Sequence, residues 1–191
     1  GQNNFLPNNL IEQRYQAIDN ATYYLGETTL KVGVDFSRIE YQDEFFRYRA
    51  GVYTFNNGFS SFVTAKPTNY RQDFSSFGGL VDYTADSFSG YLQDEWRPTN
   101  NVTVNFGIRY DYQRQPDSED KNPAYPAIES IVSDKNNWAP RLGIAWDPKG
   151  DGKSSVRAGI GVFYNNTPSL LVANALLNNG VRVLDFNISC T

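Results

Sequence analysis

The chain has 191 residues, a formal net charge of -4 and no histidine. The acidic balance argues against a nucleic-acid partner, because phosphate backbones would be repelled and no basic stripe is present. The absence of histidine excludes Ser/His and Cys/His nucleophiles, and the single cysteine, Cys190, can form neither an internal disulfide nor a Cys/His metal cluster. We therefore expect no catalytic residue, no cofactor and no metal.

Alternation of apolar and polar residues is the main signal along the chain. The first two candidate strands are residues 15–24 and 28–41, and in the second Leu30, Val32 and Val34 alternate with Lys31, Gly33 and Asp35. Successive side chains of a strand point to opposite faces, so such a strand lies between an apolar and a polar medium. Further strands are predicted over 45–55, 80–97, 101–114, 138–147, 154–164 and 181–188, which makes about eight.

The longest unbroken alternation runs over residues 101–113. Its apolar side carries Val102, Val104, Phe106, Ile108, Tyr110 and Tyr112. An average strand of a globular protein has about 5–6 residues, whereas a strand that crosses a bilayer needs ~9–11. This segment is long enough to cross a membrane.

The connections between the candidate strands fall into two classes. Residues 25–28, 97–101 and 147–155 are short and rich in Gly, Pro, Asn and Asp, whereas 56–79, 116–137 and 165–180 are long. The last of these contains a predicted short helix, 170–177, preceded by Thr167-Pro168-Ser169. Short turns at one end and long loops at the other are typical of outer-membrane barrels. We predict an all-β, antiparallel, up-and-down segment of a transmembrane β-barrel.

The two phases of these strands predict two sets of residues. Trp138 and Trp146 lie eight positions apart in the apolar phase. In a tilted strand this spacing separates them by roughly 20 Å along the membrane normal. The apolar band between the two aromatic girdles of such barrels is about 25 Å high, so the two residues could lie near opposite girdles. The predicted membrane-interface aromatics are Trp96, Tyr110, Tyr112, Trp138, Trp146 and Tyr164. The predicted lumen-lining residues are Lys31, Asp35, Glu95, Arg97, Arg109, Asp111, Arg141 and Arg157.

Two hairpins resemble a known family. The segments 90–97 (GYLQDEWR) and 101–111 (NVTVNFGIRYD) resemble the recurrent barrel hairpin of TonB-dependent outer-membrane receptors. The segments 138–153 (WAPRLGIAWDPKGDGK) and 156–164 (VRAGIGVFY) resemble the next hairpin of the Oar-like branch, whose members carry an N-terminal carboxypeptidase-regulatory-like domain. Residues 29–36 (TLKVGVDF) are similar to another strand of that branch. The resemblance covers roughly residues 15–165. It implies a barrel of about 22 strands with a plug in its lumen.

The resemblance also implies a location and partners. These are the outer membrane of a Gram-negative cell, its lipid, the receptor's own plug domain, TonB, and an unidentified nutrient. We expect residues 1–191 to form a partial barrel domain, in which we find no plug domain, TonB box or signal peptide. Arg109, Arg141 and Arg157 could donate to plug carboxylates or to an anionic solute, but ordinary pairing with Asp111, Asp35 or Asp147 is the favoured interpretation.

Other interpretations stay open at this point. A structural surface β-protein or fragment would assemble through open strand edges, and a porin-like channel would need neither plug nor TonB. A soluble carbohydrate-binding β-sandwich would bury the apolar phase of residues 102–112 against a second sheet. The segment 147–152 (DPKGDG) faintly resembles a calcium loop, but it lacks the distal Glu of an EF-hand, so a tight turn is favoured.

Overall fold

The computed structural model describes residues 8–126 and 131–190. Two sheets and two short helices make up the fold, in the order β1 (Asn8–Leu25), β2 (Thr28–Phe45), β3 (Val52–Thr54), α1 (Phe59–Val63), β4 (Asn69–Phe74), β5 (Leu80–Thr99), β6 (Val102–Arg114), β7 (Trp138–Trp146), β8 (Val156–Gly161), α2 (Ser169–Leu177) and β9 (Leu184–Ser189). Neither helix is long and apolar enough to cross a membrane.

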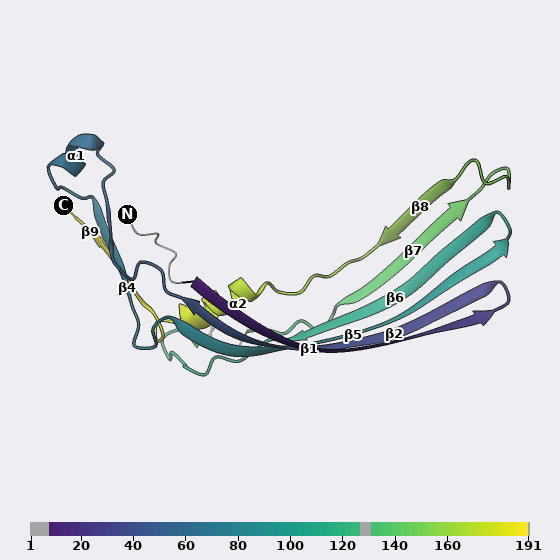
Figure 1. Cartoon of the computed structure of the whole chain (residues 1–191), viewed down its shortest axis with the longest axis horizontal. Coiled ribbons are helices and arrows are strands. Elements are labelled where there is room, and N and C mark those ends of the chain that lie inside the picture. Colours follow the sequence, from purple (N-terminus) through teal and green to yellow (C-terminus); the bar gives the residue numbers. More distant parts are fainter. Residues whose placement is uncertain (1–7, 127–130, 191) are drawn as a thin grey trace.

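The larger sheet has six antiparallel strands in the order β1-β2-β5-β6-β7-β8. It is a long, curved and open ribbon, with the tight turns gathered at one end and the long connections at the other (Figure 1). The chain follows the sheet from one neighbour to the next, and the excursion between β2 and β5 is the only place where other strands intervene among the described residues. The predicted meander, with short turns and long loops sorted to opposite ends, is confirmed.

Two of the eight predicted strands are not part of this ribbon. Within 45–55 the chain leaves β2 at Phe45, turns, and forms only the three-residue strand β3, and Gly51 has a φ of 73° in that turn, a conformation that favours glycine. Residues 184–189 form β9, which pairs with β4. Together β3, β4 and β9 make a second, three-stranded sheet. The barrel sheet of the described residues therefore has six strands.

The strand register fixes the two faces of the barrel sheet. Val32, Leu92 and Ile108 lie side by side on one face, and Lys31, Gln93, Gly107 and Arg141 form the adjacent row on the other. The apolar row is not buried, since Leu92 is 48% and Ile108 43% exposed. No second sheet covers this face within the described residues, so the soluble-sandwich interpretation is wrong.

A small dry core lies at the loop end of the sheet, where α2 folds back onto β5 (Figure 1). Its buried members are Val81, Tyr83, Val172, Ala173, Leu176, Leu177 and Val183. The hydroxyl of Tyr83 donates a hydrogen bond of 3.0 Å to the carbonyl oxygen of Ser169, at the first residue of the helix. The predicted helix over 170–177 is confirmed, and it anchors the long connection that follows β8.

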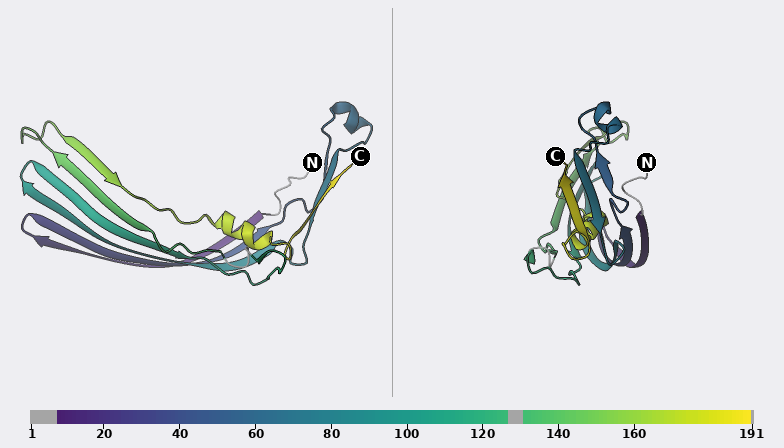
Figure 2. Two further views of the ribbon diagram at one scale, coloured as in Figure 1. Left: turned by 180° about the vertical axis from the view of Figure 1, so that it is seen from behind. Right: turned by 90° about the vertical axis from the view of Figure 1, so that its left-hand side faces the viewer.

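The second sheet and α1 form an arm that projects from the loop end of the ribbon (Figure 2). Aromatic residues line the arm: the rings of Tyr53 and Tyr70 lie 4.6 Å apart, and those of Phe74 and Phe186 lie 5.3 Å apart. The arm joins two excursions of the chain, one between β2 and β5 and the other after β8.

Candidate functional site: the inner face of the barrel sheet

The register brings the predicted lumen-lining residues onto one face of the sheet. Lys31 and Arg141 share one row, and Asp35 and Asp111 share another. The row of Arg109 lies between these two, and the rows of Glu95 and then Arg157 follow on the other side of the Lys31 row. Arg97 follows at the irregularity between Trp96 and Thr99. Residues that are distant in sequence thus share one polar face.

Several of these charges pair with one another. The Nε of Arg109 lies 2.9 Å from Oδ1 of Asp111, and a terminal nitrogen of Arg109 donates to the hydroxyl of Ser89 at 2.8 Å. Arg97 is paired with Glu95. The favoured interpretation, ordinary pairing, is right for Arg109. Asp35 instead accepts hydrogen bonds from the side-chain amide of Gln16, at 2.9 and 3.1 Å.

Arg141 and Arg157 behave differently from Arg109. The Nε of Arg157 donates to the hydroxyl of Ser155 at 3.3 Å, and the guanidinium of Arg141 lies over the ring of Phe163, 4.5 Å from its centroid. Neither side chain has a carboxylate partner in residues 8–126 and 131–190. Their pairing with Asp35 or Asp147 is therefore wrong, and both keep hydrogen-bond donors available to another molecule or domain.

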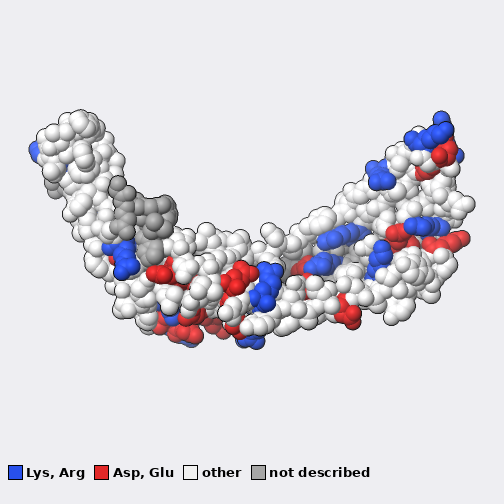
Figure 3. Space-filling model, in the orientation of Figure 1, with Lys and Arg blue, Asp and Glu red and all other residues white. Residues whose placement is uncertain are grey.

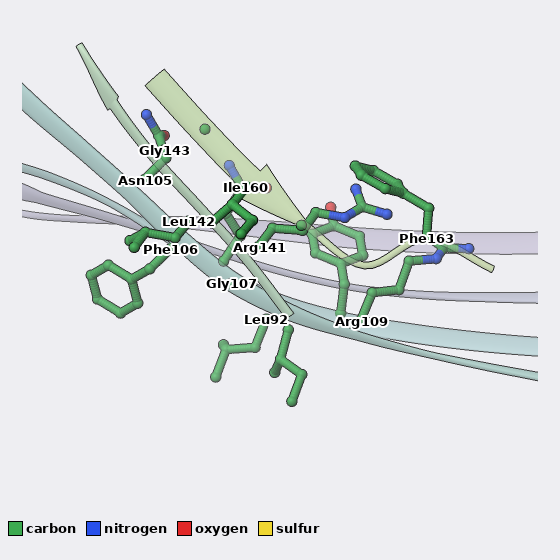
Figure 4. A pocket seen from close by; sticks show the side chains of 15 residues that line it. Leu92, Asn105, Phe106, Gly107, Arg109, Arg141, Leu142, Gly143, Ile160 and Phe163 are labelled. Atoms are coloured by element: carbon green, nitrogen blue, oxygen red, sulfur yellow. The ribbon is translucent and has the colours of Figure 1, made fainter. Parts of the chain in front are cut away.

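A glycine-lined depression of about 510 Å³ lies beside Arg141. Gly107, Gly143, Gly159 and Gly161 contribute to its lining. Figure 4 shows Arg109, Arg141 and Phe163 on one side of the ribbon, while Leu92 and Phe106 project from the other. A Cβ at Gly143 would have no neighbouring atom closer than 3.8 Å, so the backbone of β7 is open there and another backbone can approach closely.

Tyr91 and Asn20 are further inner-face residues that the sequence analysis missed. The hydroxyl of Tyr91 donates to Oδ1 of Asn20 at 2.9 Å, across β2. Gly33 permits this, since a Cβ there would lie 2.4 Å from Cε1 of Tyr91. A glycine inside a strand, with an aromatic residue on the neighbouring strand, is the sequence signal for this arrangement.

Asp147 closes the turn between β7 and β8. Its carboxylate accepts hydrogen bonds from the backbone N–H groups of Gly150 and Gly152 at 3.0 and 2.7 Å, and these bonds, with that of Gly152 the strongest, lower the pKa of Asp147. The carboxylate is thus used within the turn, as the tight-turn interpretation predicted.

Comparison with known proteins agrees with this two-faced sheet. A family model described as an outer membrane beta barrel domain matches residues 1–189. The chain belongs to this barrel family. No solved structure matches the chain.

A curated relative gives the branch of the family. The barrel domain is 28% identical over 177 residues to the TonB-dependent transporter Oar of Myxococcus xanthus, a match that covers 85% of this chain and 16% of the relative. The chain thus spans about a sixth of that relative's length. The predicted resemblance to Oar-like receptor barrels and the outer-membrane location in a Gram-negative cell are confirmed.

The outward face of the barrel domain changes from apolar to charged along the strands. The apolar row of Phe36, Phe88 and Tyr112 is followed two residues later by Arg38, Asp86 and Arg114, and Arg38 lies 3.8 Å from Asp86. Charged side chains in register cannot face hydrocarbon cheaply, so the apolar band ends here. Strands β2 and β5 continue beyond it toward the loops.

The predicted interface aromatics lie at two levels of this face. Trp96 is in register with Val104, and Trp146 with Val102, both near the tight turns. Toward the loop end the rings of Tyr110 and Trp138 lie 4.7 Å apart, and Tyr112 follows two residues beyond Tyr110. Tyr164 lies after the end of β8 at Gly161, so it continues from the sheet rather than belonging to it.

Charge is unevenly distributed over the molecule. Figure 3 shows Lys and Arg interspersed with Asp and Glu over the barrel strands, whereas the visible face of the projecting arm is almost uncharged. A mixture of both signs over the strands fits a hydrated wall better than a surface selective for one sign.

Proposed function

We propose that the chain is a third or less of the barrel of a TonB-dependent receptor that takes up an unidentified nutrient across the outer membrane. The observation that carries the proposal is the two-faced sheet, with an exposed apolar outer face and a polar inner face, in a chain similar to a TonB-dependent transporter over 85% of its length. A plug domain, TonB and outer-membrane lipid are the partners this function requires. The proposed role is transport, not catalysis.

We assign the inner face to contacts with whatever fills the lumen. Arg141 is its most available donor, because its guanidinium stacks on Phe163 without a carboxylate partner among the described residues. The open backbone at Gly143, in the same depression, allows close approach of a polypeptide or solute. Arg141 and Arg157 would bind carboxylates of the plug or of an anionic nutrient, whereas Arg109 is held by Asp111.

Uptake by the full-length receptor tests this function. A strain that lacks the gene and the same strain carrying the intact gene are grown on a complex peptone and polysaccharide hydrolysate, and mass spectrometry records which solutes disappear. We expect depletion of a defined solute class only in the complemented strain, and loss of that depletion with a protonophore, because TonB couples uptake to the inner-membrane potential.

Two alternatives give different results in the same cells. Depletion that persists with the protonophore would indicate a porin-like channel. The second possibility is a structural β-protein that assembles through strand edges, because unpaired strand edges pair readily with other chains. That function predicts no depletion of any solute and a full-length protein isolated as a multimer.

A further inference from the structure

The two excursions beyond the barrel strands meet at β4 and β9. The excursion between β2 and β5 contributes β4, and the excursion after β8 contributes β9 (Figure 1). Six residue pairs join these strands, and one of the pairs places Asp73 directly opposite Asp185. Two carboxyl groups therefore face each other where separate parts of the chain are held together.

The surroundings of the two carboxyl groups are unequal. Arg71 on β4 donates to both oxygens of Asp185, with Nε at 2.9 Å from Oδ1. Asp73 is only 5% exposed, and its Oδ1 has no hydrogen-bond partner among the described residues. Directly opposed residues of paired strands have side chains close enough to interact, so the carboxyl groups of Asp73 and Asp185 lie within reach of each other. Because two ionised carboxylates are acceptors only, a hydrogen bond between them requires a proton on one of them.

The charges that face the pair decide where the proton lies. Burial and the negative charge of Asp185 raise the pKa of Asp73 to about 6, and this outweighs the opposing effects of Arg71 on β4 and Arg47 in the turn after β2. The hydrogen bonds from Arg71 lower the pKa of Asp185. Tyr48 adds a neutral contact, since its hydroxyl lies 3.4 Å from a nitrogen of Arg71. The proton is therefore held by Asp73.

We propose that Asp73 and Asp185 form a proton-operated clasp that ties the two excursions together in acid and loosens the Leu184–Phe186 end of β9 near neutral pH. Protonated Asp73 donates to ionised Asp185 across the strand pair. Loss of that proton leaves two negative charges opposite each other, partly compensated by Arg71 and Arg47. The remaining backbone pairs keep β9 attached, so the change is local.

The direction of the pH effect on stability follows from the raised pKa of Asp73. A carboxyl whose folded pKa lies above its unfolded value contributes stability that is complete below the unfolded value and is lost as pH rises through the folded value. The contribution is thus present near pH 4 and lost as pH rises through about 6. The clasp depends on contacts within the arm and not on the nutrient.

Hydrogen exchange of the full-length receptor in lipid vesicles tests the clasp. Protection of the backbone amides of residues 184–189 is compared at pH 5 and pH 7.5 after correction for the intrinsic exchange rate. We expect roughly tenfold less protection at pH 7.5, with a midpoint near 6. Equal protection at the two pH values would overturn the proposal.

Two variants and a control separate the clasp from a general pH effect. Asp73→Asn should keep acid-like protection at both pH values, because the introduced amide donates to Asp185 without titrating. Asp185→Asn should lower the midpoint, because the amide introduced on β9 can then donate to ionised Asp73. Asp82→Asn, at an exposed position of β5, should leave the wild-type response unchanged. An unchanged midpoint in Asp185→Asn, or a wild-type pH response in Asp73→Asn, contradicts the proposal.

Discussion

The barrel strands and the loop end of the molecule use their apolar residues in opposite ways. In the barrel strands the apolar residues face outward and stay exposed, as Leu92 and Ile108 do. At the loop end Val172, Leu176 and Leu177 are buried between α2 and β5. We propose that the first region uses lipid as its apolar partner, whereas the second makes its own core. Substitutions that bury, expose or charge a side chain should therefore have different effects in the two regions.

The largest expected effect is in the dry core. Leu177 is 1% exposed beneath α2, so Leu177→Ala should cost about 2–5 kcal/mol in the free energy that holds the helix on β5, through lost burial and a cavity. The measurement is hydrogen exchange of residues 169–177 in the full-length protein. Leu171→Ala, at an exposed position of the same helix, is the matched control and should change this free energy by less than about 0.5 kcal/mol.

A charge on the outward face tests whether that face contacts lipid. Ile108→Arg should cost about 2–4 kcal/mol of unfolding free energy in vesicles, because the guanidinium would lie in the middle of the apolar band. Urea titration of the full-length receptor refolded in vesicles measures it. Asn105→Arg, on the inner face of the same strand, should cost far less. Equal losses in the two variants would show that hydrocarbon does not distinguish the faces.

A smaller effect is expected where the inner face is packed. Gly33→Ala would place a Cβ 2.2 Å from Oδ1 of Asn20 and displace Tyr91. Because the hydrogen bond from Tyr91 to Asn20 would be lost, we expect the free energy of unfolding to fall by about 1 kcal/mol. Gly143→Ala is the control, since the nearest atom to its Cβ would be 3.8 Å away. The same urea titration compares them, and similar stability of the two variants would contradict a packing role for Gly33.

The smallest effect is expected at the β7–β8 turn. The folded pKa of Asp147 is lowered by backbone N–H donors, so its contribution is present above the unfolded pKa and lost as pH falls through the folded value. Protection of the Gly152 amide should accordingly fall on acidification below the usual range of an aspartate. Asp147→Asn should remove most of this dependence, and a neutral-pH loss of protection in the wild type would contradict it.

Much of the barrel region follows from local sequence, and much of the arm does not. Alternation over 28–41 and 101–114 predicts both the strands and their two faces, because successive side chains of a strand point to opposite faces of the sheet. The pairing of β9 with β4 joins residues more than a hundred positions apart, and no local pattern specifies it. Arg109 and Asp111 lie on the face that the alternation assigns to them, but Tyr91 was missed because its role depends on a glycine of a neighbouring strand.

The sequence by itself determined which side chains lie on the apolar face of the barrel sheet and which lie on the polar face, since that choice depends only on strand periodicity. Tertiary structure decided which charges are satisfied and which stay available. Asp111 lies on the same strand as Arg109, whereas the packing of neighbouring segments adds Ser89 to Arg109 and sets Phe163, not a carboxylate, beside Arg141. Tertiary structure also placed Asp73 opposite Asp185, since the free energy of pairing two distant segments depends on contacts that form only when the chain has folded.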